Sequence, residues 1–179
     1  MALFIVIIMT SSILGFVWTN ITTDNYSYKG YKFKLQGDYF VVYINGQKIN
    51  TNYLPNDIEN IEMDEEVKLK IKENPMFYIS FDIDSKNIEY IDKSRFELTN
   101  ELQKINIHII SGKTNNSINY NIPIITCENA TNYVPVIYLK DSNTTKFSLQ
   151  DDCIIAESDS REGFIALKDL IIYTVFDII

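Results

Sequence analysis

Asp82 and Asp84 are the residues whose type and spacing come nearest to a catalytic or metal-binding pattern. They stand two residues apart at the end of the apolar run 76–83, so in a strand their carboxylates share one face. Sites gather at the carboxyl ends of parallel strands, and carboxylates bind divalent cations. The pair predicts a candidate metal or hydrolytic site. The alternative is that two acidic residues only mark where a strand reaches solvent.

Two further features fit a catalytic or ligand-binding pattern less well than the two aspartates. The tetrapeptide SGKT at 111–114 follows a strand as a phosphate-binding loop does, but Ile107 stands where that loop needs its first glycine, and no helix pattern follows. His108 is the only histidine, which excludes a histidine metal site, and nothing near it resembles a nucleophile elbow. We therefore expect no cofactor and name no catalytic residue.

Cys127 and Cys153 are the only cysteines. No C-x-x-C spacing is present, so a redox function is not indicated. In an oxidising compartment the two residues would most naturally form a disulfide, closing a loop of about 27 residues and stabilising the fold by up to ~3.5 kcal/mol. Two separate buried thiols are the alternative in a reducing compartment.

Composition and charge describe a folded, acidic domain. Hydrophobic residues make up 46% of the chain, and glycine and proline are few, which excludes disordered and fibrous classes. The net charge is −8 and no basic stretch is present, so we expect no nucleic-acid partner. The acidic stretch from Asp57 to Glu66 predicts a solvated surface segment, with weak cation binding as the alternative.

Residues 2–18 carry no charged side chain. At ~1.5 Å per residue a helix of this length spans about 25 Å, the short end of what a bilayer core needs. A cleavable signal peptide would have a basic start and small residues near the cut, and this segment has neither. We therefore favour an uncleaved membrane anchor with Trp18 at the interface, and cleavage remains the alternative.

Glycosylation motifs of the form Asn-x-Ser/Thr favour an extracytoplasmic location for the rest of the chain. They begin at Asn20, Asn25, Asn115, Asn129 and Asn143. We expect a transmembrane anchor or signal segment at 1–19, a polar tether at 20–30, and a single extracytoplasmic domain at 31–179 on the cell membrane.

The elements that must position these residues begin with a β-meander over 31–50. Its clearest signal is Asn45-Gly46, which predicts a type I′ hairpin because both residues accept a positive φ. A short helical turn at 54–57 follows. Alternation of apolar and polar residues over 66–71 predicts another strand.

A βαβ unit is expected in the middle of the chain. The run 76–83 predicts an interior strand buried on both faces. Ser94 and Glu97 fit a capping box for a helix that ends near Lys104, and 105–111 is the next strand. The two strands should be parallel.

The last third predicts a strand at 134–140 and a hairpin of 145–149 with 153–157. Asp159 and Glu162 fit a second capping box, which opens a terminal helix that is apolar on nearly every side. A buried core helix is the main interpretation, and a strand or a partner contact is the alternative. The expected fold class is α/β or α+β, with a transmembrane helix, a β-meander, a mixed sheet containing one βαβ unit, a β-hairpin and a C-terminal helix.

The chain contains the runs YKGYKF, INGQKI, YLPNDIENI, CENAT, NYVPVIYL, DSNTTKF, CIIAES and GFIALKDLIIYTVFDII. Together these runs, which cover most of the chain, resemble a group of uncharacterised membrane-anchored proteins of small-genome archaea. The resemblance implies an N-terminal anchor, an exported α/β domain, a pairing of Cys127 with Cys153, and no assigned activity. The terminal helix departs from the more polar, Gly-tipped ending of the group, which leaves room for a partner contact.

The sequence predicts a noncatalytic, membrane-anchored extracytoplasmic module. As a component of the cell envelope, it would bind an unknown protein or glycan partner while residues 2–18 hold it to the membrane. One alternative is a membrane-anchored hydrolase that uses Asp82 and Asp84 with a divalent metal. Another is a small subunit of a membrane complex, which would show an uncovered apolar strip on its final helix.

Overall fold

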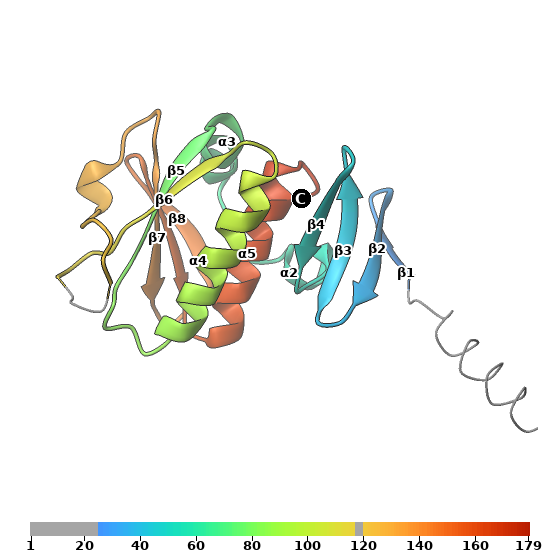
Figure 1. Cartoon of the computed structure of the whole chain (residues 1–179), viewed down its shortest axis with the longest axis horizontal. Coiled ribbons are helices and arrows are strands. Elements are labelled where there is room, and N and C mark those ends of the chain that lie inside the picture. Colours follow the sequence, from blue (N-terminus) through green and yellow to red (C-terminus); the bar gives the residue numbers. More distant parts are fainter. Residues whose placement is uncertain (1–24, 117–119) are drawn as a thin grey trace, which may run out of the picture.

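A computed structural model of the chain describes residues 25–116 and 120–179, and these form three layers (Figure 1). A four-stranded antiparallel sheet, sheet A, is one outer layer, and a five-stranded mixed sheet, sheet B, is the other. Two long helices, α4 and α5, lie between them. The expected transmembrane helix lies outside the described residues. Within those residues, no helix has both the length and the apolar character to cross a membrane.

Sheet A is the predicted meander with one strand more. Its strands, in spatial order, are β1 (Asn25–Tyr28), β2 (Tyr31–Gln36), β3 (Tyr39–Ile44) and β4 (Gln47–Thr51). The type I′ hairpin is confirmed, because Asn45 has φ 50° and Gly46 has φ 80°.

The tether expected at 20–30 needs a correction, since residues 25–28 form β1. The segment NYSY is polar, yet alternate residues are tyrosines that can face the sheet interior. Tyr26 packs edge-on against Phe40 with 5.4 Å between ring centroids. Strand β1 also pairs with β2 through a two-residue turn at Lys29 and Gly30, which have φ values of 45° and 89°.

Sheet B contains the βαβ unit. In spatial order its strands are β6 (His108–Ser111), β5 (Met76–Phe81), β7 (Val136–Asp141), β9 (Cys153–Ser158) and β8 (Lys146–Gln150). Neighbours are parallel except for the β8–β9 hairpin. Helix α4 (Ile88–Gln103) connects β5 to its parallel neighbour β6, so the βαβ prediction is confirmed.

Helix α3 (Glu65–Glu73) occupies the place where we expected a strand over 66–71, and that prediction is wrong. Val67 and Ile71 are four residues apart and fully buried, while Leu69 between them is 52% exposed. The apolar residues therefore follow the helical period. Acidic residues in the first turn and lysines in the last turn also favour a helix here. A short helix, α2 (Pro55–Ile58), precedes α3 as expected.

Both predicted capping boxes are misplaced. Helix α4 begins at Ile88, so Ser94 lies inside the helix and is buried. Helix α5 (Arg161–Val175) is capped by Ser160, whose Oγ accepts a hydrogen bond from Gly163 N at 3.2 Å, and Asp159 stands one residue too early. The S/D-x-x-E spacing is common enough to arise where another residue takes the cap.

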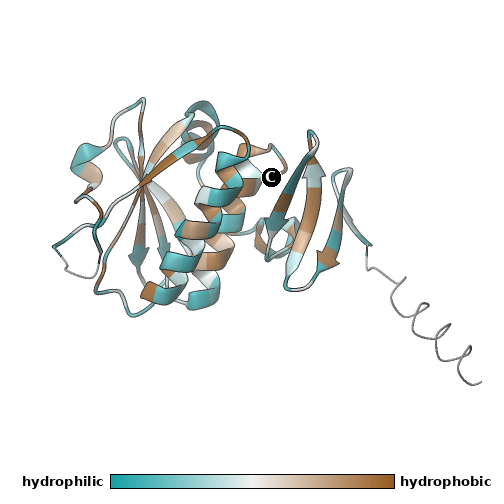
Figure 2. Ribbon diagram, viewed as in Figure 1, coloured by the Kyte–Doolittle hydropathy of each residue, from teal (hydrophilic) through white to brown (hydrophobic). Residues whose placement is uncertain are grey.

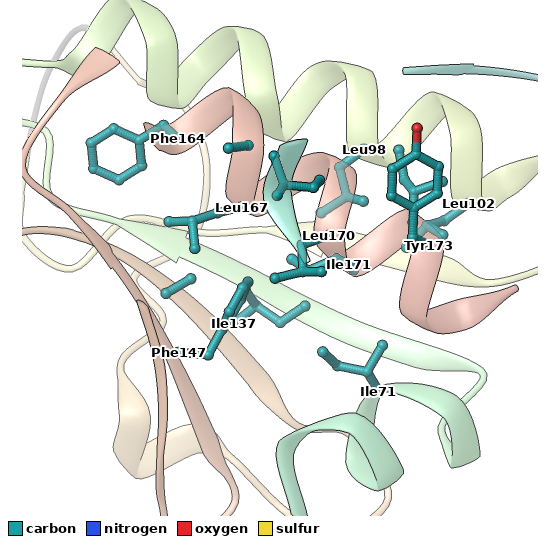
Figure 3. Close-up of a cluster of buried hydrophobic side chains, with 14 of the residues drawn as sticks. Ile71, Leu98, Leu102, Ile137, Phe147, Phe164, Leu167, Leu170, Ile171 and Tyr173 are labelled. Atoms are coloured by element: carbon teal, nitrogen blue, oxygen red, sulfur yellow. The ribbon is translucent and has the colours of Figure 1, made fainter. Parts of the chain in front are cut away.

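Helix α5 is the centre of the core. Residues 163–174 are all buried, so it presents no uncovered apolar strip, and the interpretation as a core helix is confirmed. Figure 3 shows its side chains meeting Ile137, Phe147 and Ile71 on one side and Leu98 and Leu102 of α4 on the other. Tyr173 packs edge-on against Phe33 of sheet A at 6.0 Å. Figure 2 shows hydrophobic residues in the strands of both sheets and along α4 and α5.

Replacement of Gly163 tests the tight start of α5. A Cβ there would lie 1.9 Å from Ser158 Oγ and 2.7 Å from Thr145 Oγ1, two hydroxyls that are hydrogen bonded to each other. Helix propensity alone would favour alanine by about 1 kcal/mol. The clash is larger, so Gly163→Ala should lower the free energy of unfolding by about 1–3 kcal/mol in urea titrations.

Gln103→Ala, at an exposed position of α4, is the control and should change stability by less than about 0.5 kcal/mol. A Gly163→Ala protein as stable as the wild type would contradict the close packing of α5 against β9.

Candidate functional site

Asp82 and Asp84 follow β5 at the carboxyl end of the parallel strands, where we expected them. Asp82 Oδ1 accepts a hydrogen bond from Asp84 N at 3.0 Å, and Asp84 Oδ2 accepts one from Asn115 Nδ2 at 3.0 Å. The two carboxylates therefore order the loops after β5 and β6. Among the described residues, no group of three His, Cys, Asp or Glu side chains is placed to hold a metal ion.

Asp141, at the end of β7, is a third carboxylate at this edge, and sequence reasoning missed it. Its Oδ2 accepts hydrogen bonds from Ser85 Oγ at 2.7 Å and Lys86 N at 3.2 Å, and its Oδ1 accepts one from Asn87 Nδ2 at 2.8 Å. These bonds hold the turn that leads into α4. The edge is thus a network of satisfied polar groups that fixes the start of a helix.

The SGKT segment does not form a phosphate loop. Lys113 is 7% exposed, and its Nζ donates to the carbonyl of Tyr120 at 2.6 Å. Ser111 Oγ accepts from Arg95 Nη1 at 2.8 Å. His108 is exposed at the start of the edge strand β6.

Cys127 and Cys153 form a disulfide, so the pairing is confirmed. It joins the short 3₁₀ helix η1 (Cys127–Asn129) to the first residue of β9. Residues 120–135 thereby cover part of the face of sheet B that α5 does not cover. Ile125, which is 6% exposed, packs there, and its carbonyl accepts a hydrogen bond from Ser80 Oγ of β5.

The glycosylation motifs fall in different environments. Asn25, Asn129 and Asn143 are exposed. The amide nitrogen of Asn115 is occupied by its bond to Asp84, and Asn20 lies outside the described residues. Of the candidates described, Asn129 and Asn143 combine exposure with a position outside the strands.

A cleft of about 310 Å³ lies between sheet A and α4, and we call it the α4 cleft. It is lined by Tyr39, Asn50, Lys93, Phe96, Glu97, Asn100 and Glu101. Phe96 is 62% exposed, which is unusual for so large an apolar side chain. The cleft therefore combines one open aromatic ring with amide, hydroxyl and carboxylate groups and with the ammonium group of Lys93.

Glu101 attaches α4 to the edge of β4. Its carboxylate accepts hydrogen bonds from Asn50 N at 3.2 Å and Asn50 Nδ2 at 3.0 Å. Lys104 Nζ lies 2.6 Å from the same carboxylate and also donates to the carbonyl of Lys48 at 2.9 Å. Side chains of α4 thus satisfy backbone groups of a strand that has no neighbour on this side.

Glu97 joins the cleft to the interior. Tyr39 Oη donates to its Oε1 at 2.8 Å, and this hydrogen bond is the main reason that the pKa of Tyr39 is raised. On the inner side, Lys168 Nζ lies 2.9 Å from Glu97 Oε2. The Glu97 carboxylate therefore neutralises a lysine that the solvent does not reach.

Lys168 and Asp169 are adjacent charged residues inside the buried part of α5, with 2% and 0% exposure. Lys168 Nζ lies 2.7 Å from Asp169 Oδ1 and donates to Asn52 Oδ1 at 2.8 Å. Asp169 Oδ2 accepts hydrogen bonds from the backbone nitrogens of Asn52 at 2.7 Å and Tyr53 at 2.9 Å. The pair thus fixes the segment after β4 against α5.

Burial raises the pKa of Asp169 from 3.8 to about 6, because removal from water disfavours the ionised carboxylate. Lys168 and the two backbone N–H groups act in the opposite direction. The balance shows that desolvation outweighs these partners.

Comparison with family models, with curated proteins and with solved structures finds no match to this chain. The geometry of the described residues therefore supplies the evidence for function.

Sequence reasoning missed the α4 cleft because its parts are distant in the chain. Glu97 was assigned to a helix cap, and Tyr39 was read only as a strand residue. One signal was present: a Lys-Asp pair interrupts the apolar run of the terminal helix. Charges on an otherwise buried helix require partners from another element, and that signal points to a buried ion network.

The raised pKa of Asp169 predicts a specific pH dependence. Between pH 3.8 and about 6 the Asp169 carboxyl group keeps its proton in the folded protein and loses it in the unfolded chain. The tighter proton binding therefore stabilises the folded state fully below pH 3.8, and this stabilisation is lost as the pH rises through about 6. Asp169→Asn should remove it. The stability advantage of wild type over this variant should shrink by up to about 3 kcal/mol between pH 4 and pH 7.

Urea unfolding of both proteins across this pH range measures the difference. Asp151→Asn, at an exposed turn position, serves as the control for loss of a carboxylate. Parallel stability curves for wild type and Asp169→Asn would show that Asp169 titrates alike in the folded and unfolded states.

Proposed function

We propose that this chain is a noncatalytic module of the cell envelope, held to a membrane through residues 2–18, whose extracytoplasmic domain binds a glycan in the α4 cleft. The observation that carries the location is the Cys127–Cys153 disulfide, because such bonds persist in oxidising compartments. The exposed motifs at Asn129 and Asn143 support the same location.

The groups of the α4 cleft favour an uncharged polar ligand. The carboxylates of Glu97 and Glu101 are already paired with Lys168 and Lys104, and the ammonium group of Lys93, the third charge in the lining, lies 3.9 Å from Glu97 Oε1. Their charges are thus compensated within the protein, and a charged ligand would gain little from them. The exposed ring of Phe96 offers an apolar platform. A sugar, with one apolar ring face and many hydroxyl groups, fits this combination.

The fixed position of these groups suits binding rather than chemistry. The hydrogen bonds of Tyr39 and Asn50 to the two glutamates hold the cleft in shape before any ligand arrives. Preorganisation of this kind lowers the entropy cost of binding. A general acid or base would instead need a carboxylate free to exchange a proton with a substrate.

The compartment is tested on protein purified from its native membrane. We expect no free thiols before reduction and two after it, together with added glycan mass at Asn129 or Asn143. Thiol titration and peptide mass analysis supply the readouts. Two free thiols with unmodified asparagines would place the domain in a reducing compartment and overturn the proposal.

The ligand is tested with the full chain in detergent on an array of neutral oligosaccharides. We expect Phe96→Ala to reduce retention at least about tenfold, as loss of a central aromatic contact does. Tyr133→Ala is the matched control, because Tyr133 is 82% exposed and is not part of the cleft lining. Equal retention of all three proteins, or no retention of the wild type, would overturn glycan binding in the cleft.

A further inference from the structure

The two faces of sheet A differ sharply in character. The inner face carries Phe33, Val42 and Ile49, which are at most 1% exposed. Alternate residues point the opposite way, so Lys32 and Lys34 of β2, Tyr43 of β3 and Lys48 of β4 share the outer face. We call this set the basic face.

The basic face carries the opposite charge to the protein as a whole. It gathers three lysines in a chain of net charge −8, and all three are exposed. Lys48 Nζ donates to Gln36 Oε1 at 3.1 Å, and in the described part of the chain none of the three forms an ion pair. Their charge is therefore available to an outside partner.

The surface between the lysines is concave and partly apolar. A depression of about 330 Å³ is lined by Gly30, Tyr31, Lys32, Lys34, Val41 and Tyr43. Tyr43 is 63% exposed. An exposed tyrosine flanked by lysines is the composition that favours a membrane interface, where the ring lies among headgroups and the ammonium groups meet phosphates.

The position of sheet A in the chain points to the same partner. Strand β1 begins at Asn25 and forms the outer edge of sheet A (Figure 1). Only residues 19–24 separate it from Trp18, where the proposed anchor ends. Even a fully extended connection of this length spans no more than about 25 Å. Sheet A is thus the layer of the domain that an anchor at 2–18 would keep nearest to the bilayer.

We propose that the basic face docks on anionic headgroups of the membrane that residues 2–18 enter. The inference rests on the anchor in the proposed function. An anionic surface attracts the three lysines and repels the acidic remainder of the domain, so one orientation is selected. The docked domain keeps sheet A against the headgroups and sheet B on the far side.

The test uses the full chain reconstituted in vesicles of phosphatidylcholine alone or of phosphatidylcholine with phosphatidylglycerol. Lysines are acetylated briefly and quantified by mass analysis. Lys32, Lys34 and Lys48 should react severalfold more slowly in the anionic vesicles. Lys140, exposed on β7 of sheet B, should react equally in both. About 1 M salt, which shortens the Debye length to ~3 Å, should abolish the protection.

A second experiment replaces Lys32, Lys34 and Lys48 together by glutamine and measures nitration of Tyr43. It shows whether the lysine charges, rather than the nearness of the anchor alone, bring the face to the lipid. Anionic lipid should protect Tyr43 in the wild type and not in the variant. Tyr133, the most exposed tyrosine on the other side of the domain, is the reference for nitration.

The failures of the two proposals are distinguishable. A chain that floats with neither kind of vesicle has no anchor, and both proposals fall. A chain that floats with both but shows equal lysine reactivity keeps its anchor and loses the docking. Protection that persists in detergent or in neutral vesicles would assign the face to a protein partner and overturn docking on lipid.

Discussion

Complete burial of one helix governs this domain. Helix α5 lies between two sheets and beside α4, so each neighbour packs against a different side of it. Its apolar residues need no explanation beyond that, but Lys168 and Asp169 do, because charges removed from water must be compensated. Compensation comes from Glu97 of α4 and from the backbone after β4. One buried network therefore fixes the helical layer and sheet A against each other, and loss of one partner would leave a charge without compensation.

The same network shapes the surface. Glu97 faces both the buried lysine and the α4 cleft, and Glu101 faces both the cleft and the free edge of β4. The polar groups in the cleft are thus held in place by their ion pairs and hydrogen bonds to other elements of the protein. On the opposite side of the molecule the disulfide plays the equivalent part, since it attaches a segment with little regular structure to sheet B. On that face of sheet B, a segment held by a disulfide takes the place of a second layer of helices.

Patterns local in sequence predicted most of the elements. The turn at Asn45-Gly46, the βαβ unit and the β8–β9 hairpin follow from short-range chemistry. Helix α3 was missed because alternation over 66–71 fits a strand until Leu69 proves to be exposed. The cleft and the ion network could not be predicted in detail, because Tyr39, Glu97 and Lys168 come from three distant segments. Their meeting depends on how the layers stack, which no local pattern contains.

The order of elements along the chain has a consequence for folding. Helix α5, on which both sheets depend, is the last element of the domain, and its contacts with Thr51 and Phe33 span well over a hundred residues. Until it is available, the meander has no surface on which to bury its inner face. Contacts of such long range make folding slow, and intermediates with open apolar faces are prone to association. A domain built this way must be kept apart from its copies until its last helix is in place.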